Sequence, residues 1–306
     1  MVMRKYKIAN YVVELDYPKE FIAPEMDLYE CSGNFTSDIY WTVVKGTIKD
    51  ELPEKMAWNS CGKLKVGECK GSVYVIYPNR SYYKVDAVIY ENNFKKVTYY
   101  VRDGLQPSQG KKYIQEMGKY LFMMHQEAFV LALTLDGAVP IHSSALVYDN
   151  QGIIFASEVH SRRMDITKLW NVEFGTPLLS QGLTICKVEH DRALLYGAPW
   201  GGTAVSYRNQ AIECKCIVFE EQDELNWVYR PDTYDSYQRL YDQTLTPTWY
   251  QQLKEWKVHN ILTIIKSKIP CIVLACKRDL SAVTMIKHEI DHLAKDGEIT
   301  KEPLVG

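Results

Sequence analysis

One stretch decides the fold: Ile153-Ile154-Phe155-Ala156-Ser157-Glu158-Val159-His160-Ser161-Arg162-Arg163-Met164-Asp165-Ile166-Thr167-Lys168-Leu169-Trp170. An apolar strand leads into a short polar segment and then into a helix, the layout that presents backbone N–H groups to a phosphate. The stretch nevertheless contains no glycine, the residue that lets a backbone approach phosphate oxygens closely. It therefore predicts the frame of a phosphate-binding loop without its usual chemistry.

Composition and charge describe an ordinary soluble globular protein. The 306 residues are 46% hydrophobic and carry a formal net charge of −2, which excludes general attraction to nucleic acid or to anionic membranes. The longest apolar run, near residues 128–133, is far too short to span a bilayer. Residues 1–16 contain no signal-peptide core. We expect a cytoplasmic protein.

The eight cysteines have neither the spacing of a zinc site nor the density of a disulfide scaffold. We interpret them as buried thiols.

The chain divides near residue 110 in this interpretation. Residues 1–110 form a β-rich domain, expected to be an antiparallel sheet, and residues 103–110 hold the glycines and proline of a linker. The expected strands are 8–15, 39–48, 72–77, 82–90 and 97–101.

Residues 111–306 form the second domain, an α/β layout within an α+β chain. It begins with a helix at 113–135 that is apolar on most faces, so we expect it to pack across the sheet of this domain. Thr246 and Pro247 are a start signal for a helix at 247–266. The other expected strands are 145–148, 152–156, 178–179, 184–188, 193–196, 212–220, 225–229 and 271–276, and the other helices, besides the one within the opening stretch, are 234–242 and 280–294.

Five segments of this second domain, in order and spacing, carry a family resemblance. They are residues 141–148, 153–155, 168–170, 196–202 and 269–279. Together they resemble the HPr kinase/phosphorylase-related family of the phosphoenolpyruvate-carboxykinase-like superfamily, over about residues 138–290. The resemblance implies a mixed sheet with a central helix of the phosphate-loop type.

The resemblance also shows which groups the chain lacks. Laid onto the family's nucleotide-binding loop, Ser157 takes the first small position and Arg162 the second glycine, while Arg163 replaces the lysine and Met164 the metal-binding hydroxyl. A thioether is a poor ligand for Mg²⁺, which prefers oxygen. We therefore expect no cofactor, and ATP with Mg²⁺ only if the chain is an atypical phosphotransferase.

The family's acidic pair, which serves the metal and the general base, is also missing. The matching positions here are Ser180 and Gln181, neither of which can replace a carboxylate. Losing the loop and the acids together indicates a pseudoenzyme.

Several side chains remain candidates for a ligand site. His142 matches the family's histidine near the phosphate region and is a catalytic candidate, or else it caps a strand and bonds to backbone. His160, Ser161, Arg162 and Arg163 could hold an anion, or they form a solvated loop.

Another candidate is the turn at residues 197–202. Gly197, Trp200, Gly201 and Gly202 suit a substrate-facing loop with an exposed aromatic ring. The alternative is a plain hairpin connection with Trp200 in the core.

His288-Glu289-Ile290-Asp291-His292 matches the His-Glu-x-x-His pattern of zinc hydrolases. We expect both histidines to face solvent, opposite an apolar stripe of Val283, Ile286, Ile290 and Leu293. A zinc hydrolase using His288, Glu289 and His292 is therefore a remote alternative.

The leading hypothesis is a non-catalytic binding or scaffold protein, a pseudokinase. Because relatives of this kind accompany enzymes that modify ribosomally made peptides, the resemblance suggests a precursor peptide or a modifying enzyme as partner. The alternative is an ATP-dependent phosphotransferase acting on a peptide or protein hydroxyl, with Arg163 and His142 replacing the usual groups. Nucleic acid and membrane are not expected as partners, and a homo-oligomer stays open.

Overall fold

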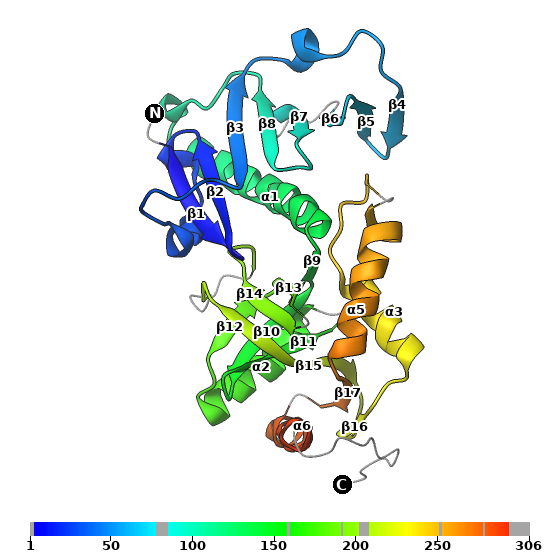
Figure 1. Ribbon diagram of the computed structural model, residues 1–306. Coiled ribbons are helices and arrows are strands. Elements are labelled where there is room, and N and C mark those ends of the chain that lie inside the picture. The colour runs from blue at the N-terminus through cyan, green and yellow to red at the C-terminus, as the bar shows by residue number, and fades with distance from the viewer. Residues whose placement is uncertain are drawn as a thin grey trace. The chain divides into compact units, whose positions relative to one another are not determined.

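The computed structural model describes residues 3–77, 85–157, 160–190, 192–201, 208–250, 253–277 and 279–293. The chain forms two compact units, each built on its own mixed sheet (Figure 1). The first unit comprises residues 1–136 and 246–253, and the second comprises residues 137–245 and 254–306.

The sheet of the first unit has the strand order β1-β2-β3-β8-β7-β6-β5-β4. The expectation of a wholly antiparallel sheet was wrong, because β3 pairs in parallel with both β2 and β8. A long segment that contains two 3₁₀ helices joins β2 to β3, so the chain returns in the same direction instead of turning back in a hairpin. The strands are β1 (Arg4–Ile8), β2 (Tyr11–Asp16), β3 (Ile39–Lys45), β4 (Trp58–Cys61), β5 (Leu64–Cys69), β6 (Ser72–Ile76), β7 (Val85–Glu91) and β8 (Lys96–Val101).

The first predicted strand, at residues 8–15, is divided by a hairpin turn. Ala9 and Asn10 have φ of 48° and 67°, and the flanking strands β1 and β2 pair around them. Two positive φ angles in succession are typical of the tight turns whose twist matches that of antiparallel strands.

Helix α1 (Lys111–Leu135) confirms the predicted helix but belongs to the first unit. The ring of His125 stacks on that of Trp41 at 4.4 Å, and Phe129 meets Tyr11 edge to face at 6.1 Å. The helix thus packs on β2 and β3. The expectation that it crosses the second sheet was wrong, and the first compact unit ends after Asp136 and not near residue 110.

The segment 246–253 returns to the first unit and corrects a second expectation. Residues 247–250 form a turn and not the start of a helix. Trp249 Nε1 donates to Glu127 Oε1 at 2.8 Å, and the Trp249 ring lies 5.5 Å from that of Tyr90. This tertiary packing overrides the local start signal. The predicted helix corresponds instead to the π-helical segment η5 (Lys254–Val258) followed by helix α5 (His259–Lys268).

The sheet of the second unit has the order β12-β10-β11-β15-β14-β13-β9, with β17 also beside β15 and β16 beside β17. Strand β15 pairs in parallel with β11 and with β17, and the remaining neighbours are antiparallel. The strands are β9 (Ala138–Ile141), β10 (Ser143–Tyr148), β11 (Gln151–Ala156), β12 (Leu178–Gln181), β13 (Thr184–Glu189), β14 (Arg192–Gly197), β15 (Ala211–Gln222), β16 (Trp227–Tyr229) and β17 (Cys271–Cys276).

Helices cover both faces of this sheet (Figure 1). Helices α2 (His160–Phe174) and α6 (Leu280–His292) pack with Ile153 and Phe155 of β11 on one face. Helices α3 (Thr233–Gln243) and α5 pack with Ile154 and Ala156 on the other. Burial on both faces explains why residues 153–156 of β11 and all of β17 are apolar, and each fully buried large aliphatic side chain contributes about 1.5–3 kcal/mol.

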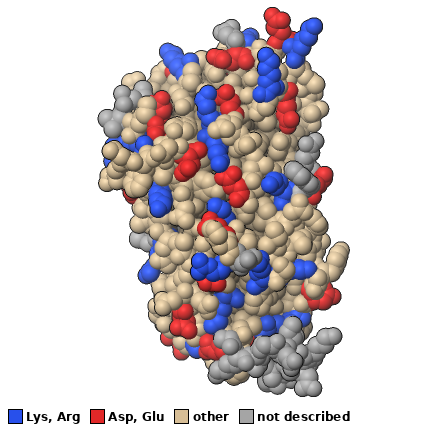
Figure 2. Space-filling model, in the orientation of Figure 1, with Lys and Arg blue, Asp and Glu red and all other residues tan. Residues whose placement is uncertain are grey.

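No helix in the described part of the chain is long and apolar enough to cross a membrane. On the face drawn in Figure 2, acidic and basic side chains are interspersed, as the small net charge leads one to expect.

Candidate functional site

A pocket of about 250 Å³ lies in the second unit, where β11 and β15 end. Because these strands are parallel neighbours with Ala156 opposite Phe219, their carboxyl ends meet at one edge of the sheet. Crevices at this edge are the usual ligand sites of sheets with parallel strands and helices on both faces. The described lining residues are Ala156 at the end of β11, Ser157 after it, Phe219, Glu220, Glu221 and Gln222 on β15, and Arg239, Asp242 and Gln243 on α3.

Helix α3 forms one wall of the pocket, and its first turn is held by a side-chain cap. The carboxylate of Asp232 accepts a hydrogen bond from the backbone N–H of Asp235 at 2.8 Å. A cap of this kind stabilises a helix by about 1 kcal/mol. It also sets the start of the helix, so that residues 239, 242 and 243 reach the pocket from successive turns.

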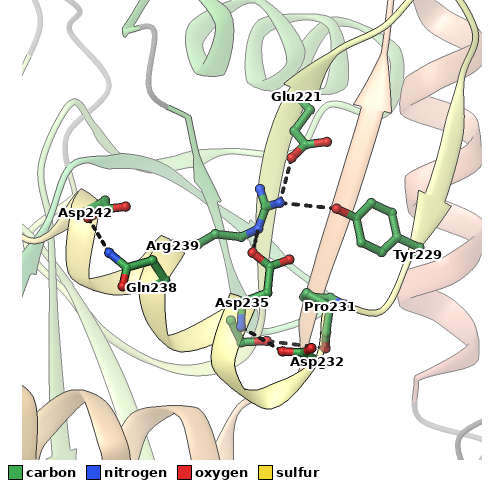
Figure 3. Close-up of polar contacts among 9 residues, drawn as sticks. Glu221, Tyr229, Pro231, Asp232, Asp235, Gln238, Arg239 and Asp242 are labelled. Carbon is green, nitrogen blue, oxygen red and sulfur yellow. Dashed lines mark hydrogen bonds and ion pairs between the residues drawn. The ribbon is translucent and has the colours of Figure 1, made fainter.

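Arg239 is the most strongly bonded polar side chain of this wall (Figure 3). Its Nε donates to Asp235 Oδ1 at 2.8 Å, one turn earlier on α3. Its terminal Nη2 lies 2.7 Å from Glu221 Oε1 and donates to the Tyr229 hydroxyl at 3.2 Å. The guanidinium therefore ties α3 to β15 and β16.

These bonds control the charge of the arginine. Burial alone would lower the pKa of Arg239, but hydrogen bonds to Asp235 and Glu221 raise that pKa above its ordinary value. Burial also raises the pKa of Tyr229, with Arg239 acting in the opposite direction. The arginine remains a cation, and two carboxylates already compensate its charge.

The pocket lining includes several charged side chains. Among the described lining residues, these are the carboxylates of Glu220, Glu221 and Asp242 and the guanidinium of Arg239. Glu221 forms an ion pair with Arg239, whereas Asp242 accepts a neutral hydrogen bond from Gln238 Nε2 at 3.0 Å (Figure 3). Within the described residues, no group of three or more His, Cys, Asp or Glu side chains is placed to hold a metal ion.

Ser180 and Gln181, which the sequence resemblance matched to the family's acids, lie at the end of β12 and are fully buried. Ser180 Oγ shares a hydrogen bond of 2.6 Å with Thr184 Oγ1, which also accepts from Ser143 Oγ at 2.8 Å. Gln181 lies opposite Ser144, and its amide nitrogen and oxygen have no hydrogen-bond partner in the described structure. These neutral groups supply no general base.

The structure places the histidine and arginine candidates as follows. His142 lies between β9 and β10 with its side chain exposed, and its backbone N–H donates to the carbonyl of Gln243 at 2.7 Å. Helix α2 begins at His160 and includes Ser161, Arg162 and Arg163, whose side chains lie outside the described part. His142 is not among the pocket-lining side chains, although Gln243 beside it is.

The glycine-rich turn has a structural role at its start. A Cβ on Gly197 would collide with the backbone carbonyl oxygens of Leu179 and Arg208, so this close approach requires glycine. Trp200 is only 3% exposed, so the expected exposed ring is instead buried. Gly201 is exposed, and Gly202 lies outside the described residues.

The His-Glu-x-x-His segment lies on α6 as expected, with Val283, Ile286 and Ile290 buried and His288 exposed. The ring of His292 is 4.1 Å from that of His288, and its Nδ1 donates to the His288 carbonyl at 2.7 Å. Glu289 accepts from Arg230 at 3.1 Å and 2.5 Å. The glutamate thus forms an ion pair that links α6 to the chain after β16.

Sequence reasoning did not identify Glu220, Glu221, Arg239 or Asp242 as site residues. The strand ending at Glu220 and the helix ending at Asp242 were both predicted. The one sequence signal for these site residues was therefore their place at the end of a predicted strand or helix. The partners of Arg239 come from three separate elements, and no local spacing connects them.

Comparison with known proteins gives similarity to solved structures. No protein-family model and no curated protein matches the chain. Among solved structures, the chain is similar to the HPr(Ser) kinase/phosphatase from Coxiella burnetii, at 12% sequence identity. The match covers 51% of this chain and 98% of that one, with a TM-score of 0.32.

Proposed function

We propose that this chain is a non-catalytic binding protein that uses the edge of β11 and β15 to hold a peptide or protein partner. The observation that carries the proposal is the charge of the pocket. Its described lining includes the carboxylates of Glu220, Glu221 and Asp242, and the guanidinium of Arg239 is already compensated by Glu221 and Asp235. The triphosphate of a nucleotide would meet like charges there, which costs binding free energy.

Two further properties support a binding role. The pocket, at about 250 Å³, is smaller than the roughly 300–1,000 Å³ typical of small-molecule sites, so it suits a single side chain better than a nucleotide. The residues at the end of β12 are a serine and a glutamine, neither of which can act as a general base. The resemblance noted in the sequence suggests a ribosomally made precursor peptide, or an enzyme that modifies it, as the partner.

Isothermal titration calorimetry with ATP and Mg²⁺ tests the proposal. We expect no saturable heat up to millimolar nucleotide and no rise in the melting temperature of the protein, because a ligand that binds only the folded state must raise that temperature. Micromolar, magnesium-dependent binding would contradict the proposal and favour the phosphotransferase.

A further inference from the structure

We infer that helix α6 carries a surface site for a divalent transition-metal ion, held by the imidazoles of His288 and His292. Zinc, nickel and copper ions all favour imidazole nitrogen, and Cu²⁺ binds such ligands most tightly. Neither histidine lines the pocket at β11 and β15, so the site goes beyond the proposed function. The inference follows from the spacing of the two rings, the tautomer of His292 and the partners of the neighbouring acids.

The first observation is the position of the two rings. His288 and His292 are four residues apart on α6, so their side chains lie on one face of the helix, one turn apart. The ring centres are 4.1 Å apart, and the ring planes make an angle of 36°. Two nitrogens that bind one zinc ion at about 2.0–2.1 Å are at most about 4.2 Å from each other. Rings this close can therefore each present a nitrogen to the same ion.

The second observation is the hydrogen bond of His292. Its Nδ1 lies 2.7 Å from the backbone carbonyl oxygen of His288. A carbonyl oxygen can only accept, so Nδ1 carries the proton and the lone pair of the neutral ring lies on Nε2. Metal-binding histidines are oriented by a bond of this kind from the other ring nitrogen. Among the described residues, none forms a hydrogen bond with Nε2 of either ring, so both nitrogens are open to an ion.

The third observation is that the acids between the two histidines are already paired. Glu289 accepts from Arg230 at 3.1 Å and 2.5 Å. Asp291 accepts from the Tyr148 hydroxyl at 2.8 Å and from Lys287 Nζ at 2.6 Å. The glutamate is thus engaged in an ion pair, which distinguishes this site from that of a zinc hydrolase, where the glutamate is the base.

The protein supplies two ligands to this ion. In the described part of the chain, no further His, Cys, Asp or Glu joins the pair to make a group of three. Water or a donor from a bound molecule fills the other positions of the ion. Two ligands on one folded helix act as a chelate, because the second nitrogen is at high effective concentration once the first has bound.

The experiment uses the full chain without an added histidine tag, titrated with CuCl₂ and with ZnCl₂ by calorimetry in a buffer that does not bind metal. We expect one strong Cu²⁺ site per chain and weaker binding of Zn²⁺ at the same site. Pulsed EPR of the Cu²⁺ complex should detect two coordinated imidazoles.

Two single variants test the ligands separately. His288→Ala and His292→Ala should each lower the affinity for Cu²⁺ at least about tenfold, because each leaves one imidazole and no chelate. Their Cu²⁺ complexes should show one coordinated imidazole by EPR. His190→Asn is the matched control, because it removes an exposed histidine at a turn outside α6 and should leave the affinity unchanged. Circular dichroism should show that all three variants are folded.

Equal affinity of the parent and both alanine variants would mean an adventitious ion only and would overturn the inference. A parent complex with fewer than two coordinated imidazoles, or no binding of Cu²⁺, would overturn it as well. None of these results bears on nucleotide binding, so the proposed function stands or falls on its own titration with ATP and Mg²⁺.

Discussion

The two units each hold a basic side chain that is at least partly removed from water, and they do so in opposite ways. In the first unit, His125 is surrounded by Trp41, Tyr17 and Tyr99 with no counter-charge among the described residues, and burial lowers its pKa from 6.5 to about 3. In the second unit, Arg239 is partly buried beside Glu221 and Asp235, which raise its pKa. The first group loses its charge and the second keeps it, because only the second has carboxylate partners among the described residues.

Acidification should disturb the first unit most. Above pH 6.5, His125 is neutral in both the folded and the unfolded state, so it does not make the free energy of unfolding depend on pH there. Between pH 6.5 and about 3 the unfolded state binds a proton that the folded state cannot bind, so the free energy of unfolding falls as pH falls. At its full extent the loss is on the order of 5 kcal/mol.

The measurement is urea unfolding from pH 7 to pH 4 for the parent protein and a His125→Leu variant. The variant should lose this part of the pH dependence, because leucine binds no proton. His190→Asn, at an exposed turn with φ of 45°, is the control and should keep the parent slope. Equal slopes for the parent and His125→Leu would show that the histidine is not buried in its neutral form.

Removing the charge of Arg239 should have a smaller effect on the second unit. Arg239→Met keeps much of the side-chain volume but leaves Glu221 and Asp235 without their cation, so we expect a loss of about 1–2 kcal/mol in the free energy of unfolding. The side chain is 24% exposed, so water screens part of the loss.

The matched control for this variant is Arg192→Met. Arg192 lies 3.9 Å from Glu213, and both side chains are well exposed, so its removal should change stability by less than about 0.5 kcal/mol. Equal effects of the two variants in urea unfolding would contradict the idea that the network of Arg239 stabilises the edge of the sheet.

Gln181 extends the comparison to a neutral group without partners, and its replacement should have the smallest effect. In Gln181→Leu a buried amide without hydrogen bonds gives way to an apolar side chain of similar size, so stability should stay equal or rise by about 1 kcal/mol. Ser180→Ala, one residue earlier, removes a hydrogen bond to Thr184 and should cost about 1 kcal/mol. If Gln181→Leu cost more than Ser180→Ala in urea unfolding, the amide would have a partner that it lacks here.

The local sequence pattern predicted an element correctly where the burial of its side chains follows a regular pattern along the element. The apolar run 271–276 matches β17 residue for residue, because a strand buried on both faces is apolar throughout. The helix at 280–294 corresponds to α6, whose apolar stripe follows helical spacing. Asp279 precedes it as a cap that accepts from the Ala282 N–H at 3.0 Å.

Local pattern failed where a distant partner decided the outcome. Thr246 and Pro247 are a helix start signal, but residues 247–250 form a turn because Trp249 and Tyr250 pack against Tyr90 and Phe94. Helix α1 was predicted as a helix, yet its placement in the first unit depends on contacts of His125 and Phe129 with Trp41. Spacing along a helix shows which face is apolar and not which sheet that face will meet.

For the candidate site, the sequence by itself indicated the edge of the sheet and predicted a loss of catalytic chemistry. The strand, polar segment and helix at 153–170 predict where a phosphate would lie, and Ser180 and Gln181 carry the prediction of absent acids, since both signals are local. Only the tertiary structure brought the described charges of the pocket together. Glu221, Arg239 and Tyr229 come together from β15, α3 and β16, and electrostatic interactions depend on distances in space that the order of residues does not record.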